Sequence, residues 1–312
     1  MAPIAAYPRL SNGDLIAFRL GGNGLGNLLF TWARCRADCE RHGWHMIAPT
    51  WPSIKPKNLW RNPYDLRGYF GLFQRLPTDI AGLRRVSMLL FRRRSAEGMA
   101  PEQADRRIIE YRGMRDFFAP FMDLQPLIAR DLWAMTKARH RPAPRPDRQP
   151  LITMHIRCGD FQVAQGEAVS QQLNTRLPIS WYAEAIQQIR GQLGTEVPVR
   201  LCSDGSTDEL APVLALPGIN RSTAGSAIHD IWALSQGNLI IASGSTFSSW
   251  AIFLGQKPSL WFPGKGREAM HCDGMQWQAE WMPGQDIPDH LLGGLRSAPS
   301  APSAPMGAEE QV

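Results

Sequence analysis

The sequence predicts an α/β protein of two domains, the second of which has a doubly wound parallel sheet. In residues 151–262, apolar runs with the length of buried strands alternate with segments of helical periodicity. Near the amino terminus, an apolar run, a glycine cluster and a helical segment follow one another in the order of a βα unit. A chain of 312 residues is long enough for two such domains.

A stretch rich in proline and arginine, 139–150, contains no core-forming residue, so we expect a semi-rigid linker there. It separates an amino-terminal domain, residues 1–138, from a carboxyl-terminal domain, residues 151–295. The last segment, 296–312, is rich in Ala, Pro and Ser and has no apolar periodicity. We expect it to be a disordered tail.

The carboxyl-terminal domain shows the clearest alternation of strand and helix patterns. Strands are expected at 151–156, 197–202, 239–242 and 259–262. Helices are expected at 181–192, 207–215, 227–236 and 247–254. Because short connections between alternating strands and helices produce parallel strands, the carboxyl ends of all four strands should meet at one edge of the sheet.

The amino-terminal βα unit has glycines at its turn. We expect a strand at 15–18 and a helix at 28–42, with Gly24 and Gly26 between them. Glycines let a backbone approach a ligand closely, and a helix amino terminus attracts anions. A dinucleotide fingerprint is excluded because Asn27 stands where it needs glycine, and a P-loop is excluded because Gly-Lys-Ser/Thr is absent. An ordinary tight turn is the alternative.

The segment His-Ile-Arg-Cys-Gly-Asp, residues 155–160, follows a predicted buried strand. It places Arg157 and Asp160 just beyond the carboxyl end of that strand, where open α/β sheets bind ligands. A guanidinium there can hold a phosphate or a carboxylate with a planar fork of donors. The alternative for Arg157 and Asp160 is a structural pair that closes a turn. The alternative for His155 is a histidine packed in the core.

A third segment follows another predicted strand. Gly244 ends the apolar run, and Ser245 or Thr246 can cap the helix expected at 247–254. Free N–H groups and small hydroxyls at a helix start suit a phosphate. Ordinary capping is the alternative, but Arg157, Asp204, Ser245 and Thr246 all follow strands and should share one sheet edge.

In this order, the segments resemble the fucosyltransferase superfamily with the two-Rossmann GT-B fold, and most closely the alpha-1,2-fucosyltransferases of bacteria and animals. Gly-Leu-Gly-Asn-Leu-Leu-Phe at 24–30 is similar to the family's GxGNQMFQ-like turn, and residues 155–160 are similar to its HxRRGD segment. Three later segments are similar to its aspartate-containing strand end, its D-x-x-x-M-S helix and its N-S-T-F-S-W-W segment. They are Cys202-Ser203-Asp204, residues 230–235 and residues 244–250.

The resemblance implies a GT-B-like fold of two Rossmann-like domains with doubly wound parallel sheets. It also implies an inverting, metal-independent glycosyltransferase. Such an enzyme moves L-fucose from GDP-fucose to a hydroxyl of a glycan acceptor, for example in the synthesis of a surface polysaccharide. It needs no cofactor and no metal, and the sequence has no Asp-x-Asp pair to hold one. Two alternatives stay open: a transferase of the same fold with another GDP-sugar, and a non-catalytic descendant that binds a nucleotide or a glycan. Cys158, Leu28 and Gly244 depart from the family's usual Arg, Gln and Asn.

The resemblance also implies roles for residues. Arg157 would contact the donor's β-phosphate, and Asn27 would lie near the sugar. Inversion also needs a base for the acceptor hydroxyl, for which Asp160 and Glu167 are candidates, with a turn-capping Asp and a surface Glu as the alternatives. Arg157, Asp160 and Asn27 are the expected catalytic residues. Asp204 would contact guanine or ribose, and residues 245–247 would line the diphosphate and base. The expected substrate-binding residues are Gly24, Gly26, His155, Asp204, Ser245, Thr246 and Phe247.

The formal net charge of +6 suits anionic partners. Part of the excess lies in residues 84–94, where arginines flank an apolar segment. Such a segment is either a peripheral contact with an anionic membrane or, as the favoured alternative, a core-packing helix with solvated arginines. No nucleic-acid-binding motif accompanies the charge, so nucleic acid is not an expected partner.

The cysteine count and the amino terminus bear on the compartment. Five cysteines are an odd number and their spacing matches no common zinc site, so we expect free thiols. Residues 1–14 lack the zones of a signal peptide, and no apolar run reaches the ~20 residues of a membrane helix. We expect a cytoplasmic location. A peripheral position on the cytoplasmic side of the inner membrane is compatible with it.

Aromatic residues gather in the irregular part of the amino-terminal domain. They can stack on sugar rings of an acceptor, or they can belong to the core as most aromatic residues do. They are Trp51, Trp60, Tyr64, Tyr69 and Phe73.

Overall fold

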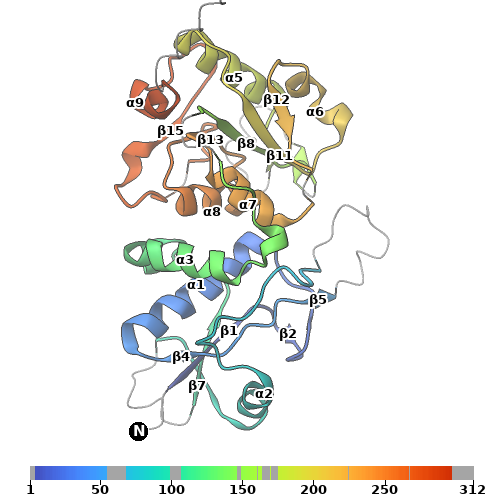
Figure 1. The fold of residues 1–312 in the computed structure, drawn as a ribbon, viewed down its shortest axis with the longest axis vertical. Coiled ribbons are helices and arrows are strands. Elements are labelled where there is room, and N and C mark those ends of the chain that lie inside the picture. Colours follow the sequence, from blue (N-terminus) through green and yellow to red (C-terminus); the bar gives the residue numbers. More distant parts are fainter. Residues whose placement is uncertain are drawn as a thin grey trace, which may run out of the picture.

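The computed structural model describes residues 4–54, 68–98, 107–145, 149–159, 161–163, 169, 175–223, 225–266 and 268–296. Its amino-terminal and carboxyl-terminal halves lie one above the other along the longest axis of the molecule (Figure 1). Each half is α/β and contains a parallel sheet, so the predicted fold class is confirmed. The exact domain boundaries remain predictions, and residues 297–312, most of the expected tail, lie outside the described residues.

Six parallel strands form the sheet of the carboxyl-terminal half, in the spatial order β12, β11, β8, β13, β14, β15. In that order their bounds are Ile219–Arg221, Val199–Ser203, Ile152–Ile156, Leu239–Ile241, Ser259–Trp261 and Gln278–Glu280. Because β8 comes first in the chain, the strand order runs outward from it and reverses between β8 and β13. This is the order of a Rossmann unit, which binds its ligands in the crevice at that reversal.

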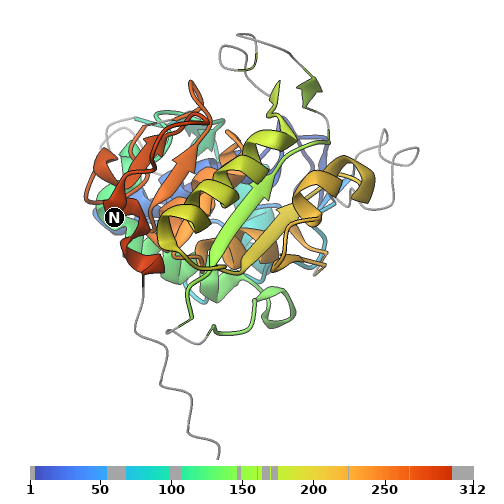
Figure 2. The same ribbon diagram turned by 90° about the horizontal axis from the view of Figure 1, so that it is seen from above.

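Helices cover both faces of this sheet (Figure 2). The side chains of Leu239 and Ile241 pack with one group of helices, and Ile240 packs with the other, as alternation along a strand requires. The first group is α5 (Ile179–Leu193), α6 (Thr207–Leu214) and α9 (Asp289–Leu292). The second group is α7 (Ala227–Ser235) and α8 (Thr246–Gly255).

The four strands and four helices expected in this half are all present, with ends within about two residues of the expected ones. The sequence did not predict the edge strands β12 and β15, because their short polar segments carry no apolar signal. Three further pieces complete the half: the paired strands β9 (Gln162–Val163) and β10 (Thr175–Arg176), and the 3-10 helices Met275–Trp277 and Gly293–Leu295.

The amino-terminal half has a smaller parallel sheet in the spatial order β4, β1, β7, β6. In that order the bounds are His45–Met46, Ala5–Arg9, Ile108–Arg112 and Arg94–Ala96. A second sheet joins β2 (Gly13–Asp14), β3 (Arg19–Leu20) and β5 (Ser53–Ile54). The helices are α1 (Leu25–His42), α2 (Gly82–Phe91) and α3 (Gln125–Met135), with 3-10 helices at Ala119–Leu124 and Ala138–His140.

The expected strand at 15–18 is wrong. These residues form the turn between β2 and β3, where Leu15 is half exposed and Ile16 has a φ of 70°. The first strand of the main sheet is β1 instead, whose Ala5, Ala6 and Tyr7 are fully buried. An apolar run of four residues carries no information about which neighbour will bury it. The expected helix at 28–42 is present as α1 and begins at Leu25.

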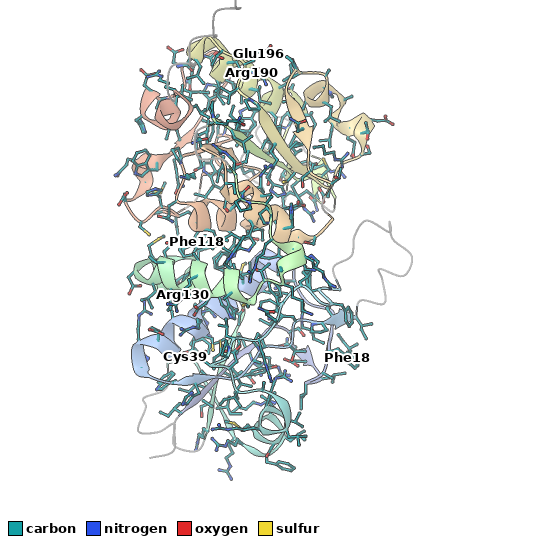
Figure 3. The ribbon with its side chains drawn as sticks, in the orientation of Figure 1. Phe18, Cys39, Phe118, Arg130, Arg190 and Glu196 are labelled. Atoms are coloured by element: carbon teal, nitrogen blue, oxygen red, sulfur yellow. The ribbon has the colours of Figure 1, made fainter. Side chains whose placement is uncertain are left out.

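The two halves share one apolar core. Phe118 lies where they meet (Figure 3), and its ring stacks on Phe253 of α8 at 4.6 Å between centroids. Phe30 of α1 packs on Trp250 of α8 at 5.1 Å. Polar contacts also cross the boundary: Gln125 donates to the carbonyl oxygen of Phe253 over 2.9 Å. The interface is therefore packed like a domain interior, which holds the two sheets in one arrangement.

The expected linker contacts the carboxyl-terminal half where it is described. The guanidinium of Arg145 donates to the carbonyl oxygen of Gln236 and to the side-chain oxygen of Asn238, each over 2.6 Å. All five cysteines lie in described positions as free thiols, as expected; four are buried and Cys272 is exposed. In the part of the chain that the structure describes, none of the helices has the length and apolar character needed to cross a bilayer.

Candidate functional site

The expected site residues of the carboxyl-terminal half come together at the carboxyl edge of its sheet. Arg157 follows β8, Asp204 follows β11, and Ser245 follows β13. These three strands are neighbours, and the order reversal lies between β8 and β13. The residues therefore surround the crevice that this topology offers to a ligand.

Arg157 and Asp204 form an ion pair across this edge. The other carboxylate oxygen of Asp204 accepts the backbone N–H of Cys158 over 2.8 Å. Asp204 thus fixes both the Arg157 side chain and the backbone that carries it. The Arg157 guanidinium also lies 5.4 Å from the ring centroid of Phe161. Asp160, the expected partner or base, lies outside the described residues, as does Glu167.

The segment after Arg157 is held by a second arginine. Arg176 donates to the carbonyl oxygens of Gly159 and Phe161, each over 3.0 Å, and to the carboxylate of Glu209 over 2.8 Å. Sequence reasoning did not find this residue, because nothing in its own surroundings marks it. Its contacts tie the backbone at Gly159 and Phe161 to helix α6 through Glu209.

Cys158 stands where the resembling family has a second arginine, and its side chain points into the core. It is buried with Ile156 and Leu210, and its sulfur packs against Gly205. Burial raises the pKa of the thiol, so the neutral form dominates at neutral pH. At this position the side chain contributes packing and no charge to the edge.

His155 lies beneath the edge in a buried cluster of hydroxyls. Its Nδ1 is 2.8 Å from the Ser243 hydroxyl and 2.9 Å from the Ser248 hydroxyl, and its ring stacks on Phe247 at 4.7 Å. Burial, with the nearby Arg157 charge, lowers the pKa of His155 to about 3. His155 is therefore neutral at physiological pH and orients the segment that begins α8.

Ser245 occupies the N-cap position of α8 but does not cap it through its side chain. Its hydroxyl contacts the Ser243 hydroxyl at 3.0 Å instead. Thr246 donates its hydroxyl proton to the side-chain oxygen of Asn27 over 2.7 Å. The expected capping role is thus wrong. The hydroxyls instead join the helix start to the His155 cluster on one side and to the amino-terminal half on the other.

The glycine turn meets the start of α8 directly. A Cβ on Gly26 would lie 2.7 Å from the Thr246 hydroxyl and 3.2 Å from the backbone nitrogen of Phe247. Gly26 therefore permits the close approach of two helices. Gly24 is the N-cap of α1, and a Cβ there would meet no atom within 4 Å, so this residue leaves open space beside the turn.

Lys265 is a further cation near this edge that sequence reasoning missed. It follows β14 and is buried, and its side-chain stem lies 3.3 Å from the position a Cβ on Gly244 would take. Gly244 has a φ of 68°, which favours glycine, and a larger residue there would crowd the side-chain stem of Lys265. The sequence could have indicated this residue by its position, since Lys265 comes shortly after a predicted strand.

A cavity of about 190 Å³ lies in the amino-terminal half. Trp51, Tyr69 and Phe73 line it and are themselves buried, which supports the core interpretation of these aromatics. Asp79 adds a carboxyl group, and burial raises its pKa to about 6. Trp60 and Tyr64 lie outside the described residues.

Over the described ranges, the His, Cys, Asp and Glu side chains form no group of three or more that could hold a metal ion. Among the described residues, Arg157, Asp204 and Lys265 follow strands of this sheet and contribute charge near its carboxyl edge.

No protein-family model and no curated protein matches this chain. Among solved structures, it is similar to the NodZ alpha-1,6-fucosyltransferase soaked with GDP-fucose, with 18% identity, 83% of this chain and 95% of that chain covered, and a TM-score of 0.48. The fucosyltransferase NodZ from Bradyrhizobium has 17% identity, coverages of 81% and 94%, and a TM-score of 0.48. POFUT1 in complex with GDP has 13% identity, coverages of 83% and 97%, and a TM-score of 0.43. Similarity at this level transfers no residue roles to this chain.

Proposed function

We propose that the protein is a glycosyltransferase whose donor is a nucleoside-diphosphate sugar, specifically GDP-fucose. The observation that supports this most directly is the ion pair of Arg157 with Asp204 at the carboxyl ends of β8 and β11, next to the strand β13 that leads into α8. A guanidinium and a helix start together suit a diphosphate. The Rossmann strand order suits the nucleotide that carries it.

The proposed reaction breaks the bond between the sugar's anomeric carbon and the diphosphate oxygen. The acceptor's hydroxyl oxygen attacks the anomeric carbon from the opposite face, and the diphosphate leaves with the electron pair. Arg157 and the helix α8 dipole stabilise the negative charge that develops on the departing diphosphate. Arg157 and the helix dipole thus take the role that a bound metal ion has in other transferases, so we propose that the reaction is metal-independent.

A base must take the acceptor proton. His155 is poorly placed for this role, because it is buried and its ring nitrogen is engaged with Ser243 and Ser248. Asp204 is engaged with Arg157 and the Cys158 N–H. We therefore propose Asp160 as the base, with Glu167 as the second candidate, and His155 as a positioning residue under the donor site.

The remaining site residues are proposed to bind substrate. Asp204 would meet the guanine or ribose when the donor enters, and residues 245–247 would line the diphosphate. Asn27, which Thr246 holds from across the interface, would lie near the transferred sugar. The acceptor is proposed to be a glycan.

The test is a donor panel. The protein is incubated with GDP-fucose, GDP-mannose and UDP-sugars, with and without glycan acceptors, and GDP or UDP release is measured. Release of GDP from GDP-fucose, and of no nucleotide from the other donors, supports the proposal. Release from another GDP-sugar supports the same-fold alternative, and tight GDP binding without any release supports a non-catalytic descendant.

The linkage is a separate and finer proposal. The sequence segments resemble alpha-1,2-fucosyltransferases, so we propose an alpha-1,2 product. Nuclear magnetic resonance of the product determines the linkage directly. A product with fucose at another acceptor hydroxyl would leave the donor proposal intact and overturn the linkage.

A further inference from the structure

Helix α2 presents apolar side chains to solvent. Leu83 is 89% exposed, Phe91 is 82% exposed and Leu90 is 60% exposed. Leu83, Val86 and Leu90 are spaced three and four residues apart, so they form a stripe along one face of the helix. Large apolar side chains gathered on one exposed face mark an interaction surface more often than scattered ones do.

The opposite face of α2 holds the helix on the protein. Met88 and Leu89 are buried in the core of the amino-terminal half. Arg85 points inward as well, and donates to the carbonyl oxygens of Ala48 and Ile16 over 2.7 and 2.8 Å. This face therefore packs on the core as expected. The core-packing interpretation does not explain the exposed apolar stripe on the other face.

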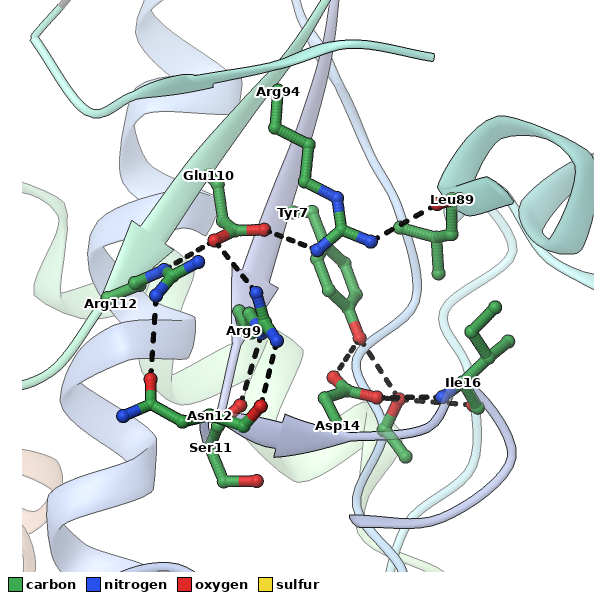
Figure 4. Close-up of polar contacts among 11 residues, drawn as sticks. Tyr7, Arg9, Ser11, Asn12, Asp14, Ile16, Leu89, Arg94, Glu110 and Arg112 are labelled. Atoms are coloured by element: carbon green, nitrogen blue, oxygen red, sulfur yellow. Dashed lines mark hydrogen bonds and ion pairs between the residues drawn. The ribbon is translucent and has the colours of Figure 1, made fainter. Parts of the chain in front are cut away.

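The charge around the stripe is positive. Arg84 and Arg93 are exposed, Arg92 is partly exposed, and residues 80–96 contain no Asp or Glu. Nearby carboxylates are engaged on the inner side. Glu110 pairs with Arg94 at 2.8 Å and also with Arg9 and Arg112, as Figure 4 shows. Glu97 pairs with Arg34 at 2.9 Å.

We propose that the α2 face, defined as Leu83, Val86, Leu90, Phe91, Arg84 and Arg93, docks on an anionic lipid surface. Apolar side chains would enter the boundary between head groups and acyl chains, and the arginines would contact the anionic head groups. Helix α2 lies at the end of the amino-terminal half that is remote from the carboxyl-terminal half (Figure 1). Docking there leaves the carboxyl edge of the other half accessible to its ligand.

The test is flotation of the full chain with vesicles. The chain is expected to float with phosphatidylglycerol–phosphatidylcholine vesicles and to bind pure phosphatidylcholine vesicles much more weakly. Raising salt to about 1 M should release it, because the Debye length falls to roughly 3 Å. Replacing both exposed arginines, Arg84→Gln with Arg93→Gln, should weaken binding about 25-fold, at roughly five-fold for each arginine.

A second variant removes the apolar part. Leu90→Ser with Phe91→Ser should abolish flotation with anionic vesicles. The matched control is Met275→Ser with Met282→Ser, which removes two half-exposed apolar side chains from the other half and should float like the wild type. Melting curves with and without GDP show whether each variant keeps its fold, and flotation itself does not depend on the donor.

Three outcomes would overturn the proposal. The first is a wild-type chain that does not float with anionic vesicles. The second is a folded Leu90→Ser, Phe91→Ser variant that still floats. The third is a wild-type dimer in size-exclusion chromatography that this variant converts to a monomer, which would assign the α2 face to a second copy of the chain.

Discussion

The indole N–H of Trp250 donates to the carbonyl oxygen of Gly26 over 2.7 Å, and joins helix α8 of one half to the first turn of α1 in the other. The two residues are 224 positions apart. The same close approach puts Asn27 against Thr246. The glycine turn therefore contributes to the site by fixing the start of α8 together with the His155 cluster of the carboxyl-terminal half.

Gly26→Ala is expected to lower the free energy of unfolding by about 1–3 kcal/mol, the usual cost of overpacking. The added methyl group would lie 3.1 Å from the Thr246 carbonyl carbon, so the two helices would have to separate. Urea unfolding measures the change. Gly191→Ala in α5 is the control: a Cβ there meets open space, and stability should stay equal or rise slightly. Equal stability of the Gly26 variant and wild type would show that the contact is loose.

Arg157→Ala is expected to lower kcat by about 10²-fold, because a preorganised charge at the departing diphosphate is lost. Arg157→Lys should recover little, since an ammonium cannot reproduce the planar fork. Steady-state kinetics with GDP-fucose and melting curves are measured together. Arg130→Ala, which changes an exposed arginine on α3, is the control. Near-normal turnover of the Arg157→Ala enzyme would make this residue structural.

Transfer activity is expected to survive excess EDTA. The sequence offers no Asp-x-Asp pair, and the proposed charge stabilisation comes from Arg157 and the α8 terminus. Product formation is compared with and without EDTA after exhaustive dialysis. Complete loss that Mn²⁺ or Mg²⁺ restores would contradict the metal-independent reaction.

Stability is expected to fall as the pH falls from about 6.5 towards 3, in part through His155. Its pKa is about 3 in the native protein and 6.5 ordinarily, so in this range the unfolded chain binds a proton that the native protein does not. The contribution is about 3 kcal/mol between pH 7 and pH 4. His155→Gln should flatten the dependence by that amount in urea unfolding. Parallel curves for the variant and the wild type would show that His155 does not titrate this way.

Asp79 is expected to have the opposite effect to His155 on the pH dependence of stability. Its pKa is about 6 in the native protein and 3.8 ordinarily, so the native protein binds the extra proton and stability falls as the pH rises from about 4 to 6. Asp79→Asn should be about 3 kcal/mol more stable than the wild type at pH 8, and the difference should shrink to less than about 1 kcal/mol at pH 4. Urea unfolding at the two pH values gives the comparison. A variant that is less stable at pH 8 would show that the carboxylate is needed there.

Much of the carboxyl-terminal half could be predicted because its signals are local. Buried parallel strands are apolar runs, and helices show a 3.6-residue period, so the strand ends that carry Arg157, Asp204 and Ser245 were found from the sequence. The short edge strands β12 and β15 and the strand β1 were missed. Their pairing depends on neighbours elsewhere in the chain, which a local pattern does not report.

The sequence by itself determined the order of the elements in the second half and the edge on which its polar residues gather. Only the tertiary structure decided what those residues contact: Asp204 holds Arg157, Ser245 bonds to Ser243 rather than capping α8, and Gly26 meets Thr246. The physical reason is that periodicity reports which face of an element is buried. The partner that buries it is selected by packing and hydrogen bonding among segments far apart in the chain.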